Sequence, residues 1–283
     1  MIIPHLSVFE LVAGNGESLI LGDESGNVRF AELGKVMDVP VRQSVSSAAP
    51  DFLVVPGEAP AGIKPFSFLR EHFCVGFAPD SRGFVMHSLQ KFDIFETWRW
   101  IVSLGIFSAA LRGKKVLLMH GALLETSPGH GVLLCADSGT GKSTAARRWQ
   151  SAGHRVVADD MVLLAWDEKC IYAHGLPTWS RLKNGESIDD LHYPFNPPLV
   201  LDSVLELRRG VDEETTGNIS HAEFFARLCR ASYYFFQNII RHLADEDKKM
   251  LNRAFASGID RLLKLAPPRA FYALKEGEMK LPL

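Results

Sequence analysis

The sequence predicts an α/β fold in which a β-rich N-terminal part precedes a larger region of mixed strands and helices. Residues 1–94 contain short runs of alternating apolar residues separated by turn residues, which is typical of strands. From residue 95 onward, apolar helical patterns alternate with strand-like runs. A glycine-rich turn also joins one apolar strand directly to a helix. We therefore predict two parts, residues 1–94 and residues 95–283.

The N-terminal part contains two candidate hairpins and one long loop. The stretch "SLILGDESGNVRFAEL" has turn residues from Gly22 to Gly26 between two apolar arms, and residues 73–89 repeat this pattern. Residues 45–65 are rich in Pro, Ala and Gly, which predicts a loop around one strand at Phe52–Val55. No motif in this part points to chemistry.

The second part opens with a long apolar helix and continues with strands. The helix spans Ile94–Leu111 and is closed by Gly113, and residues 176–198, with four prolines, predict a functional loop. The predicted strands are Lys115–Met119, Ala122–Glu125, Val132–Cys135, Arg155–Ala158, Met161–Trp166, Cys170–Ala173, Leu201–Leu207 and 270–274. The other predicted helices are Lys142–Gln150, about 220–243 and 245–265.

Composition favours an ordinary globular protein. Hydrophobic residues make up 47% and charged residues 23% of 283 residues, and the net charge of −2 gives no sign of nucleic-acid binding. From composition we expect no stretch to approach the roughly 18 consecutive apolar residues of a membrane span, and the N-terminus lacks a basic signal region. We expect a cytoplasmic protein with no membrane partner. Four well-separated cysteines are expected to be reduced thiols: Cys74, Cys135, Cys170 and Cys229.

The strand-to-helix turn has the composition of a phosphate-binding loop. Residues 136–143 read A-D-S-G-T-G-K-S, which matches G-x-x-x-x-G-K-[ST] except that Ala136 replaces the first glycine. Glycines let backbone N–H groups point into one hollow, and the helix N-terminus favours anions. Lys142 would reach the outer phosphates of ATP, and Ser143 would ligate Mg²⁺. The predicted nucleotide-binding residues are Asp137, Ser138, Gly139, Thr140, Gly141, Lys142, Ser143 and Thr144.

An acidic pair follows the loop helix. Asp159 and Asp160 stand between two apolar strands, where a carboxylate can hold Mg²⁺ or accept a proton from an attacking hydroxyl. Adjacent strand residues point to opposite faces, so the two carboxylates are expected to divide these tasks. Asp160 follows Lys142 by only 18 residues. This compact spacing favours a small phosphotransferase over a motor or transporter ATPase.

The segment "HGALLE…GVLLCADSGTGKSTAARRWQSAGHRVVADDMVLL" resembles the catalytic core of the HPr kinase/phosphorylase family. That resemblance covers about residues 119–166 and implies a P-loop kinase domain of the HPr kinase and phosphoenolpyruvate carboxykinase type. It further implies that Asp160 is the base for an acceptor serine and that His120 lies near the transferred phosphate. With Asp160 as base, the division of tasks within the acidic pair leaves Asp159 to hold the metal.

The sequence departs from the pattern of the HPr kinase family at several places, and these departures bear on the substrate. The second family signature is missing, and "LELRRG" (205–210) is interpreted as a structural strand and turn. Arg181 is the best candidate for a catalytic arginine and Glu186 for a further metal ligand. The N-terminal part is unlike that of true HPr kinases, which argues against HPr as substrate. The combination resembles HPr-kinase-related proteins of peptide-maturation cassettes, such as lasso-peptide and SynChlorMet cassette kinases, which implies a serine-bearing peptide or small-protein acceptor.

Other functions stay open at the level of sequence. They are a small-molecule kinase or carboxykinase-like phosphotransferase, a nucleotide-binding scaffold and a hydrolysing switch. The acceptor is not identified by any residue pattern, and a homo-oligomer stays open. The aromatic run Tyr233–Phe236 is expected to pack in the core or an interface rather than in a substrate groove. Four arginines are expected on solvated faces: Arg147, Arg148, Arg208 and Arg209.

Overall fold

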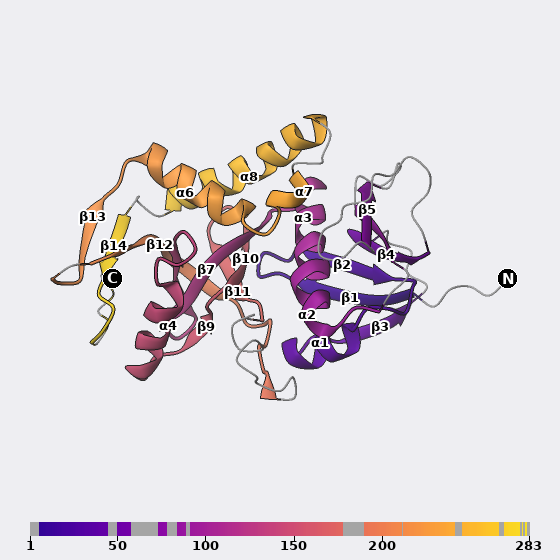
Figure 1. Cartoon of the computed structure of the whole chain (residues 1–283), viewed down its shortest axis with the longest axis horizontal. Coiled ribbons are helices and arrows are strands. Elements are labelled where there is room, and N and C mark those ends of the chain that lie inside the picture. The colour runs from indigo at the N-terminus through magenta and orange to yellow at the C-terminus, as the bar shows by residue number, and fades with distance from the viewer. Residues whose placement is uncertain are drawn as a thin grey trace.

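The protein is a mixed α/β structure with two sheets that lie side by side along the long axis of the molecule (Figure 1). The computed structural model describes residues 6–44, 50–57, 73–77, 84–88, 91–177, 190–210, 212–240, 245–265, 269–277, 279 and 281. The sheet nearest the N-terminus lies on the right of Figure 1, and the C-terminal end lies on the left.

The N-terminal sheet has the strand order β3-β1-β2-β4-β6-β5. Its elements are β1 (Leu6–Val12), β2 (Ser18–Asp23), helix α1 (Phe30–Met37), β3 (Val41–Ser44), β4 (Phe52–Pro56), β5 (Phe73–Phe77) and β6 (Phe84–Ser88). The predicted strand at 52–55 and the antiparallel pairing within 73–89 are confirmed.

The predicted hairpin across Gly22–Gly26 is wrong, because helix α1 replaces its second arm. The Asp23 carboxylate accepts hydrogen bonds from the backbone N–H groups of Ser25 (2.9 Å) and Val28 (3.1 Å). These bonds turn the chain out of the sheet and toward the helix. Strand β2 pairs antiparallel with the preceding strand β1 instead.

One continuous helical segment separates the two sheets. It consists of α2 (Ile94–Glu96), the π-helical stretch η1 (Thr97–Val102) and α3 (Ser103–Leu111). Asp93 caps it, since its Oδ1 accepts from the backbone N–H of Glu96 at 2.7 Å while Glu96 Oε2 accepts from the N–H of Asp93 at 3.1 Å. Gly113, with φ of 87°, follows its end as predicted.

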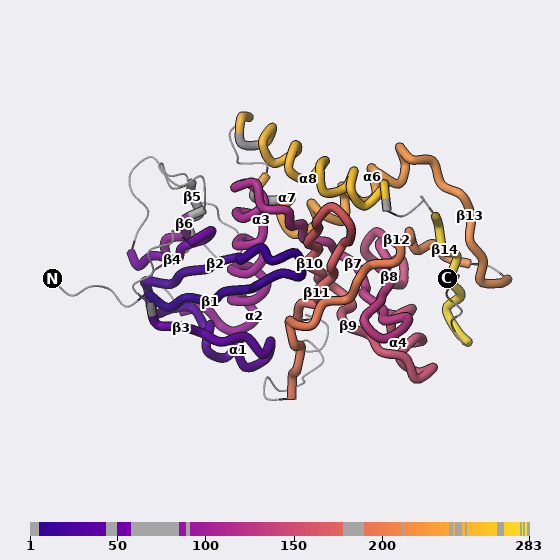
Figure 2. Tube along the Cα trace, turned by 180° about the vertical axis from the view of Figure 1, so that it is seen from behind, coloured from indigo at the N-terminus to yellow at the C-terminus, as the bar shows by residue number. Residues whose placement is uncertain are grey.

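This same segment corrects the expectation that no stretch approaches a membrane span. Ile94–Leu111 is long and apolar enough to cross a membrane, judged by length and composition alone. However, 72% of the segment is buried inside the structure. Its last part, α3, packs against β2 and β4 on one side and against the C-terminal sheet on the other, as the view from behind shows (Figure 2). Burial between two sheets accounts for its apolar character.

The C-terminal sheet has the order β11-β10-β7-β8-β12-β14-β13, and β9 pairs with β7. Its strands are β7 (Val116–Ser127), β8 (His130–Cys135), β9 (Val156–Ala158), β10 (Met161–Trp166), β11 (Ile171–Gly175), β12 (Leu199–Arg209), β13 (Thr215–Asn218) and β14 (Arg269–Ala273). Two predicted strands merge into β7, and β13 was not predicted. Strand β12 runs parallel to β8 and β14.

Helices cover both faces of this sheet. They are α4 (Lys142–Ser151), α6 (His221–Tyr233), α7 (Gln237–Ile240) and α8 (Asp245–Leu265). On one face Ala146 and Trp149 of α4 pack with Leu134 and Leu205. On the other face α3, α6 and α8 lie against β7. Figure 1 shows α6 and α8 along the top of the molecule.

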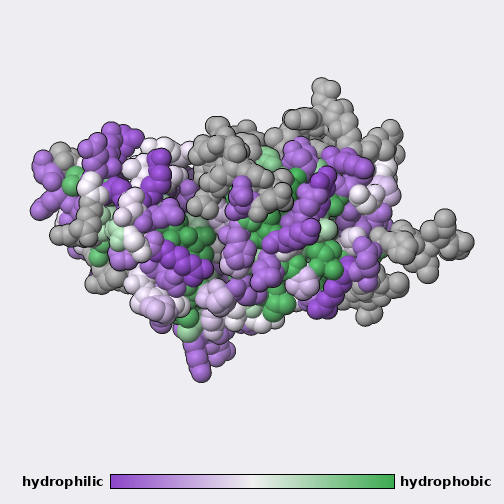
Figure 3. All heavy atoms as spheres, turned by 90° about the horizontal axis from the view of Figure 1, so that it is seen from below, coloured by the Kyte–Doolittle hydropathy of each residue, from purple (hydrophilic) through white to green (hydrophobic). Residues whose placement is uncertain are grey.

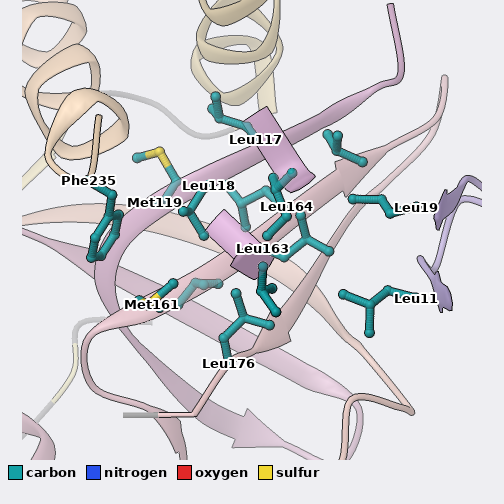
Figure 4. Packing of buried hydrophobic residues seen from close by; sticks show 14 of the residues in the cluster. Leu11, Leu19, Leu117, Leu118, Met119, Met161, Leu163, Leu164, Leu176 and Phe235 are labelled. Atoms are coloured by element: carbon teal, nitrogen blue, oxygen red, sulfur yellow. The ribbon is translucent and has the colours of Figure 1, made fainter. Parts of the chain in front are cut away.

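A single apolar cluster joins the two sheets. Leu11 and Leu19 of the N-terminal strands point toward Leu163 and Leu164 of β10 (Figure 4). Of the described large hydrophobic side chains, Val12 and Phe225 are the exposed ones. On the face seen in Figure 3, hydrophilic residues surround separate apolar patches.

Candidate functional site

The glycine-rich turn lies at the end of a central, buried strand. Strand β8 ends at Cys135, between β7 and β12, and α4 begins at Lys142. Gly139 and Gly141 have φ angles of 80° and 120°, which L side chains rarely adopt, and a Cβ at either would meet open space. The turn is therefore an open cradle of backbone, and its glycines are required by conformation rather than by crowding.

Lys142 is folded back onto this turn. It is 6% exposed, and its Nζ donates to the backbone oxygens of Ala136 at 2.8 Å and Asp137 at 3.3 Å. Burial lowers the pKa of Lys142, while the nearby Cys135, Asp160 and Asp137 oppose this shift. An ammonium group with these weak partners is suited to pair with an anion in the turn.

A cavity of about 430 Å³ opens above the turn. It is lined by Ser138, Gly139, Gly141, Lys142, Ser143 and Thr144 from the predicted loop and by Arg99, His120, Asp159, Asp160 and Tyr234 from elsewhere. Asp137 and Thr140, the other two predicted loop residues, line a second cavity next to the turn. The structure thus brings the loop and the acidic pair into one site.

The acidic pair lies in the bend between β9 and β10. We expected two carboxylates on opposite faces, yet both residues line the same cavity, because the pair is outside either strand. The Asp160 carbonyl accepts from Gly121 N–H at 3.1 Å, which anchors its backbone to β7. Asp160 Oδ2 is buried and makes no hydrogen bond to the described residues.

His120 lies beside Asp160 because strand pairing sets Met161 opposite it. Its Nε2 is 3.3 Å from Asp160 Oδ1, and its ring stacks on Tyr234 at a centroid distance of 3.9 Å. Burial lowers the pKa of His120, and the hydrogen bond that Asp160 accepts from it opposes this effect only in part. The ring is therefore neutral near pH 7 and can orient the Asp160 carboxylate without adding charge.

Arg99 and Tyr234 were missed by the sequence analysis. Arg99 comes from η1, and its NH1 is 3.9 Å from Asp160 Oδ2. Tyr234 belongs to the aromatic run predicted for the core, and its neighbours Phe235 and Phe236 are indeed buried. The one available signal for Arg99 was a single cation in an otherwise apolar helix.

The segment "LELRRG" lies beside the turn, since Glu206 pairs with Cys135 in the parallel β8–β12 ladder. Four residues of the segment line the second cavity, of about 490 Å³, together with Arg227 of α6: Glu206, Leu207, Arg208 and Arg209. Arg209 NH2 donates to the Gly139 oxygen at 3.0 Å, and Arg227 Nε is 3.0 Å from Glu206 Oε1. The segment is the end of strand β12, in agreement with the interpretation as a structural strand, and it also lines this cavity. No sequence signal reveals that β12 neighbours β8.

Arg148 is also not on a solvated face as expected. Its side chain is 9% exposed and pairs with Glu214 at 2.7 Å. Arg208 is similarly engaged, with Glu206 at 2.9 Å and with Glu223. Long side chains of this kind are held by ion pairs that sequence spacing does not show.

The remaining candidates are two residues of the predicted loop and the cysteines. Arg181 and Glu186 lie outside the described residues. Cys135, Cys170 and Cys229 are free thiols, and burial raises the pKa of Cys135 to about 12, which makes it unreactive. Within the described part of the chain, no three His, Cys, Asp or Glu residues gather as a metal site. A cation here would need ligands from a bound substrate and water as well as from the protein.

The family model of SynChlorMet cassette protein ScmC matches residues 90–272, which is more than half of the chain and includes the whole cavity. Among solved structures, the Hpr(Ser) kinase/phosphatase from Coxiella burnetii is 17% identical over 36% of this chain and 77% of that chain, with a TM-score of 0.23. A match of this kind carries no argument about the present fold. No curated protein matches the chain.

Proposed function

We propose that this chain, which belongs to the family of SynChlorMet cassette protein ScmC, is a kinase that uses ATP and Mg²⁺ to phosphorylate a serine or threonine hydroxyl on a small protein or ribosomal peptide. The observation that carries the proposal is the single cavity shared by Lys142, the open glycine turn and Asp160. A phosphate-holding loop and a carboxylate base in contact with one space are the two parts that phosphoryl transfer needs.

The residues of the turn fit a triphosphate. Backbone N–H groups from Ser138 to Ser143 and the N-terminus of α4 supply donors and positive potential. Lys142, now bonded to two backbone oxygens, would exchange them for phosphate oxygens. The hydroxyls of Ser143 and Thr144 face the same cavity.

The residues also fit a magnesium ion. Mg²⁺ is commonly held by one or two protein oxygens together with substrate phosphates and waters. Ser143 and Asp159 line the cavity and supply a hydroxyl and a carboxylate of that kind. When bound, the ion would neutralise charge on the phosphates.

The transfer itself would be an in-line displacement. The oxygen of the acceptor hydroxyl would bond to the γ-phosphorus while Asp160 accepts the proton of that hydroxyl. The bond from the γ-phosphorus to the oxygen that bridges it to the β-phosphorus would break, which releases ADP. His120, neutral and 3.3 Å from Asp160, would keep the carboxylate turned toward the acceptor. Lys142 would stabilise the charge that develops on the phosphates.

Replacement of Lys142 by Ala tests this function. We expect calorimetry to detect Mg-ATP binding to the full wild-type chain and to find it weakened by about 100-fold in Lys142→Ala, because the turn loses its one buried cation. With a serine-containing peptide encoded beside the gene, mass spectrometry should then show one added phosphate with the wild type and none with the variant. A wild-type chain that releases no heat with Mg-ATP would contradict the proposal.

The alternatives give different outcomes in the same assays. A small-molecule kinase would consume ATP with small hydroxyl compounds and leave peptides unmodified. A hydrolysing switch would release inorganic phosphate at a rate that no acceptor changes. A nucleotide-binding scaffold would bind Mg-ATP, as a kinase would, and neither transfer nor release phosphate.

A further inference from the structure

A second cation lines the cavity, on an element that no phosphate motif includes. Arg99 lies in the π-helical stretch Thr97–Val102 and lines the cavity together with Lys142, His120 and Asp160. Its side chain is 19% exposed, and NH1 lies 3.9 Å from Asp160 Oδ2. Stretches of π-helix are rare and occur frequently at functional sites.

Aromatic rings hold the Arg99 guanidinium. Its central carbon is 5.7 Å from the ring centroid of Phe95, 5.6 Å from that of Trp100 and 5.8 Å from that of Phe235. These contacts are within cation–π range and restrict the plane of the group. The cation is thereby held among aromatic rings at the wall of the cavity, where it is only partly exposed to solvent.

Arg99 and Asp160 lie next to each other in the wall of the cavity. At 3.9 Å the two groups attract as charges but are too far apart for a hydrogen bond, and Asp160 Oδ2 makes none with the described residues. The cavity that both residues line leaves room for an anion beside them.

We propose that Arg99 contacts the phosphoryl group during its transfer, and is a catalytic residue of this kinase. The inference rests on the proposed function. Charge in the transition state spreads over the three outer oxygens of the phosphoryl group, and a planar arginine can donate to two of them. Lys142 and Arg99 then stabilise the group from the loop side and the acceptor side. Under this proposal Arg99 is the catalytic arginine, the role for which Arg181 is the candidate from the sequence.

Binding of a transition-state mimic tests the proposal without an acceptor. Calorimetry would compare Mg-ADP alone with Mg-ADP plus aluminium fluoride, which imitates the phosphoryl group in transit. We expect the fluoride to tighten binding to the wild-type chain by about 100-fold, as transition-state mimics do. Arg99→Ala should lose most of this gain and keep the wild-type affinity for Mg-ADP alone.

Three matched variants separate this role from a structural one. Arg99→Lys keeps the charge without the planar fork and should retain only part of the gain. Arg253→Ala, at an exposed position of α8, should behave as wild type. If Arg181→Ala removes the gain and Arg99→Ala does not, the proposal is overturned. Thermal unfolding confirms that each variant is folded, and Arg99→Lys carries the test if Arg99→Ala is not.

The outcomes for Arg99 and for the kinase function are distinct. A wild-type chain that binds Mg-ADP but gains nothing from fluoride, or an Arg99→Ala variant with the full gain, overturns the role of Arg99 and leaves nucleotide binding in place. A wild-type chain that binds neither Mg-ADP nor Mg-ATP overturns the proposed function itself.

Discussion

Asp160 is the residue at which the proposed chemistry is most directly tested. Its backbone is tied to β7 through Gly121, and its carboxylate faces His120 on one side and Arg99 on the other. These neighbours fix the group at the wall of the cavity that Lys142 and the glycine turn also line. A carboxylate held in this way is suited to accept a proton rather than to stabilise the fold.

Replacement of Asp160 by Asn should therefore separate binding from transfer. The amide has the same shape but cannot act as a base at neutral pH, so phosphate transfer should fall by about 100-fold or more. Affinity for Mg-ATP should change by no more than a few-fold, because the loop is untouched. Calorimetry and a radioactive phosphate transfer assay measure the two quantities. Unchanged transfer would favour a nucleotide-dependent scaffold, whose function does not need this base.

At the scale of elements, the placement of β12 beside β8 supports the glycine turn, because it brings arginine side chains next to it. Parallel pairing of Leu205 with Leu134 and of Glu206 with Cys135 brings the end of β12 next to the turn. Arg209 can then donate to the Gly139 oxygen, and Arg227 of α6 reaches Asp137. The turn is thus braced from two neighbouring elements.

Replacement of Arg209 by Ala should loosen this brace. We expect Mg-ATP affinity to fall by about 5- to 10-fold, as is usual for loss of one charge-assisted hydrogen bond in a partly exposed place. The unfolding midpoint should stay close to that of wild type, because Arg209 is exposed. Calorimetry and thermal unfolding measure the two effects. Arg209→Lys is the matched control and should recover part of the affinity, and an Arg209→Ala affinity equal to wild type would show that the brace is not needed.

The same elements show what the sequence could and could not predict. Strands such as Val132–Cys135 and the helix from Lys142 follow from local pattern, and so do the glycine turn and the acidic pair. Local pattern also misled, because the Asp23 turn that looked like a hairpin leads into helix α1. The positions of Arg99 and Arg209 beside the glycine turn and Asp160 could not be predicted, since they depend on which strands and helices become neighbours. That arrangement is set by packing between residues far apart in the sequence.

At the scale of the whole molecule, His174 links the two sheets. It is 1% exposed on β11, its Nδ1 is 2.8 Å from the Phe195 oxygen, and its Nε2 accepts from the backbone N–H of Gly14 at 3.0 Å. Gly14 belongs to the turn between β1 and β2, so this ring connects the N-terminal sheet to the C-terminal one. The pattern requires a neutral ring that carries its proton on Nδ1.

Burial lowers the pKa of His174 from 6.5 to about 4, so stability should depend on pH through this residue. The unfolded chain takes up a proton below about pH 6.5 while the folded chain resists until about pH 4, so the free energy of unfolding should fall as the pH drops through this window. The loss due to His174 should be about 2 kcal/mol between about pH 8 and about pH 5. Urea unfolding at both pH values measures it. His174→Gln should be less stable at high pH but should lose less stability on acidification. Equal pH dependence in His174→Gln and wild type would mean that this link between the sheets does not sense protons.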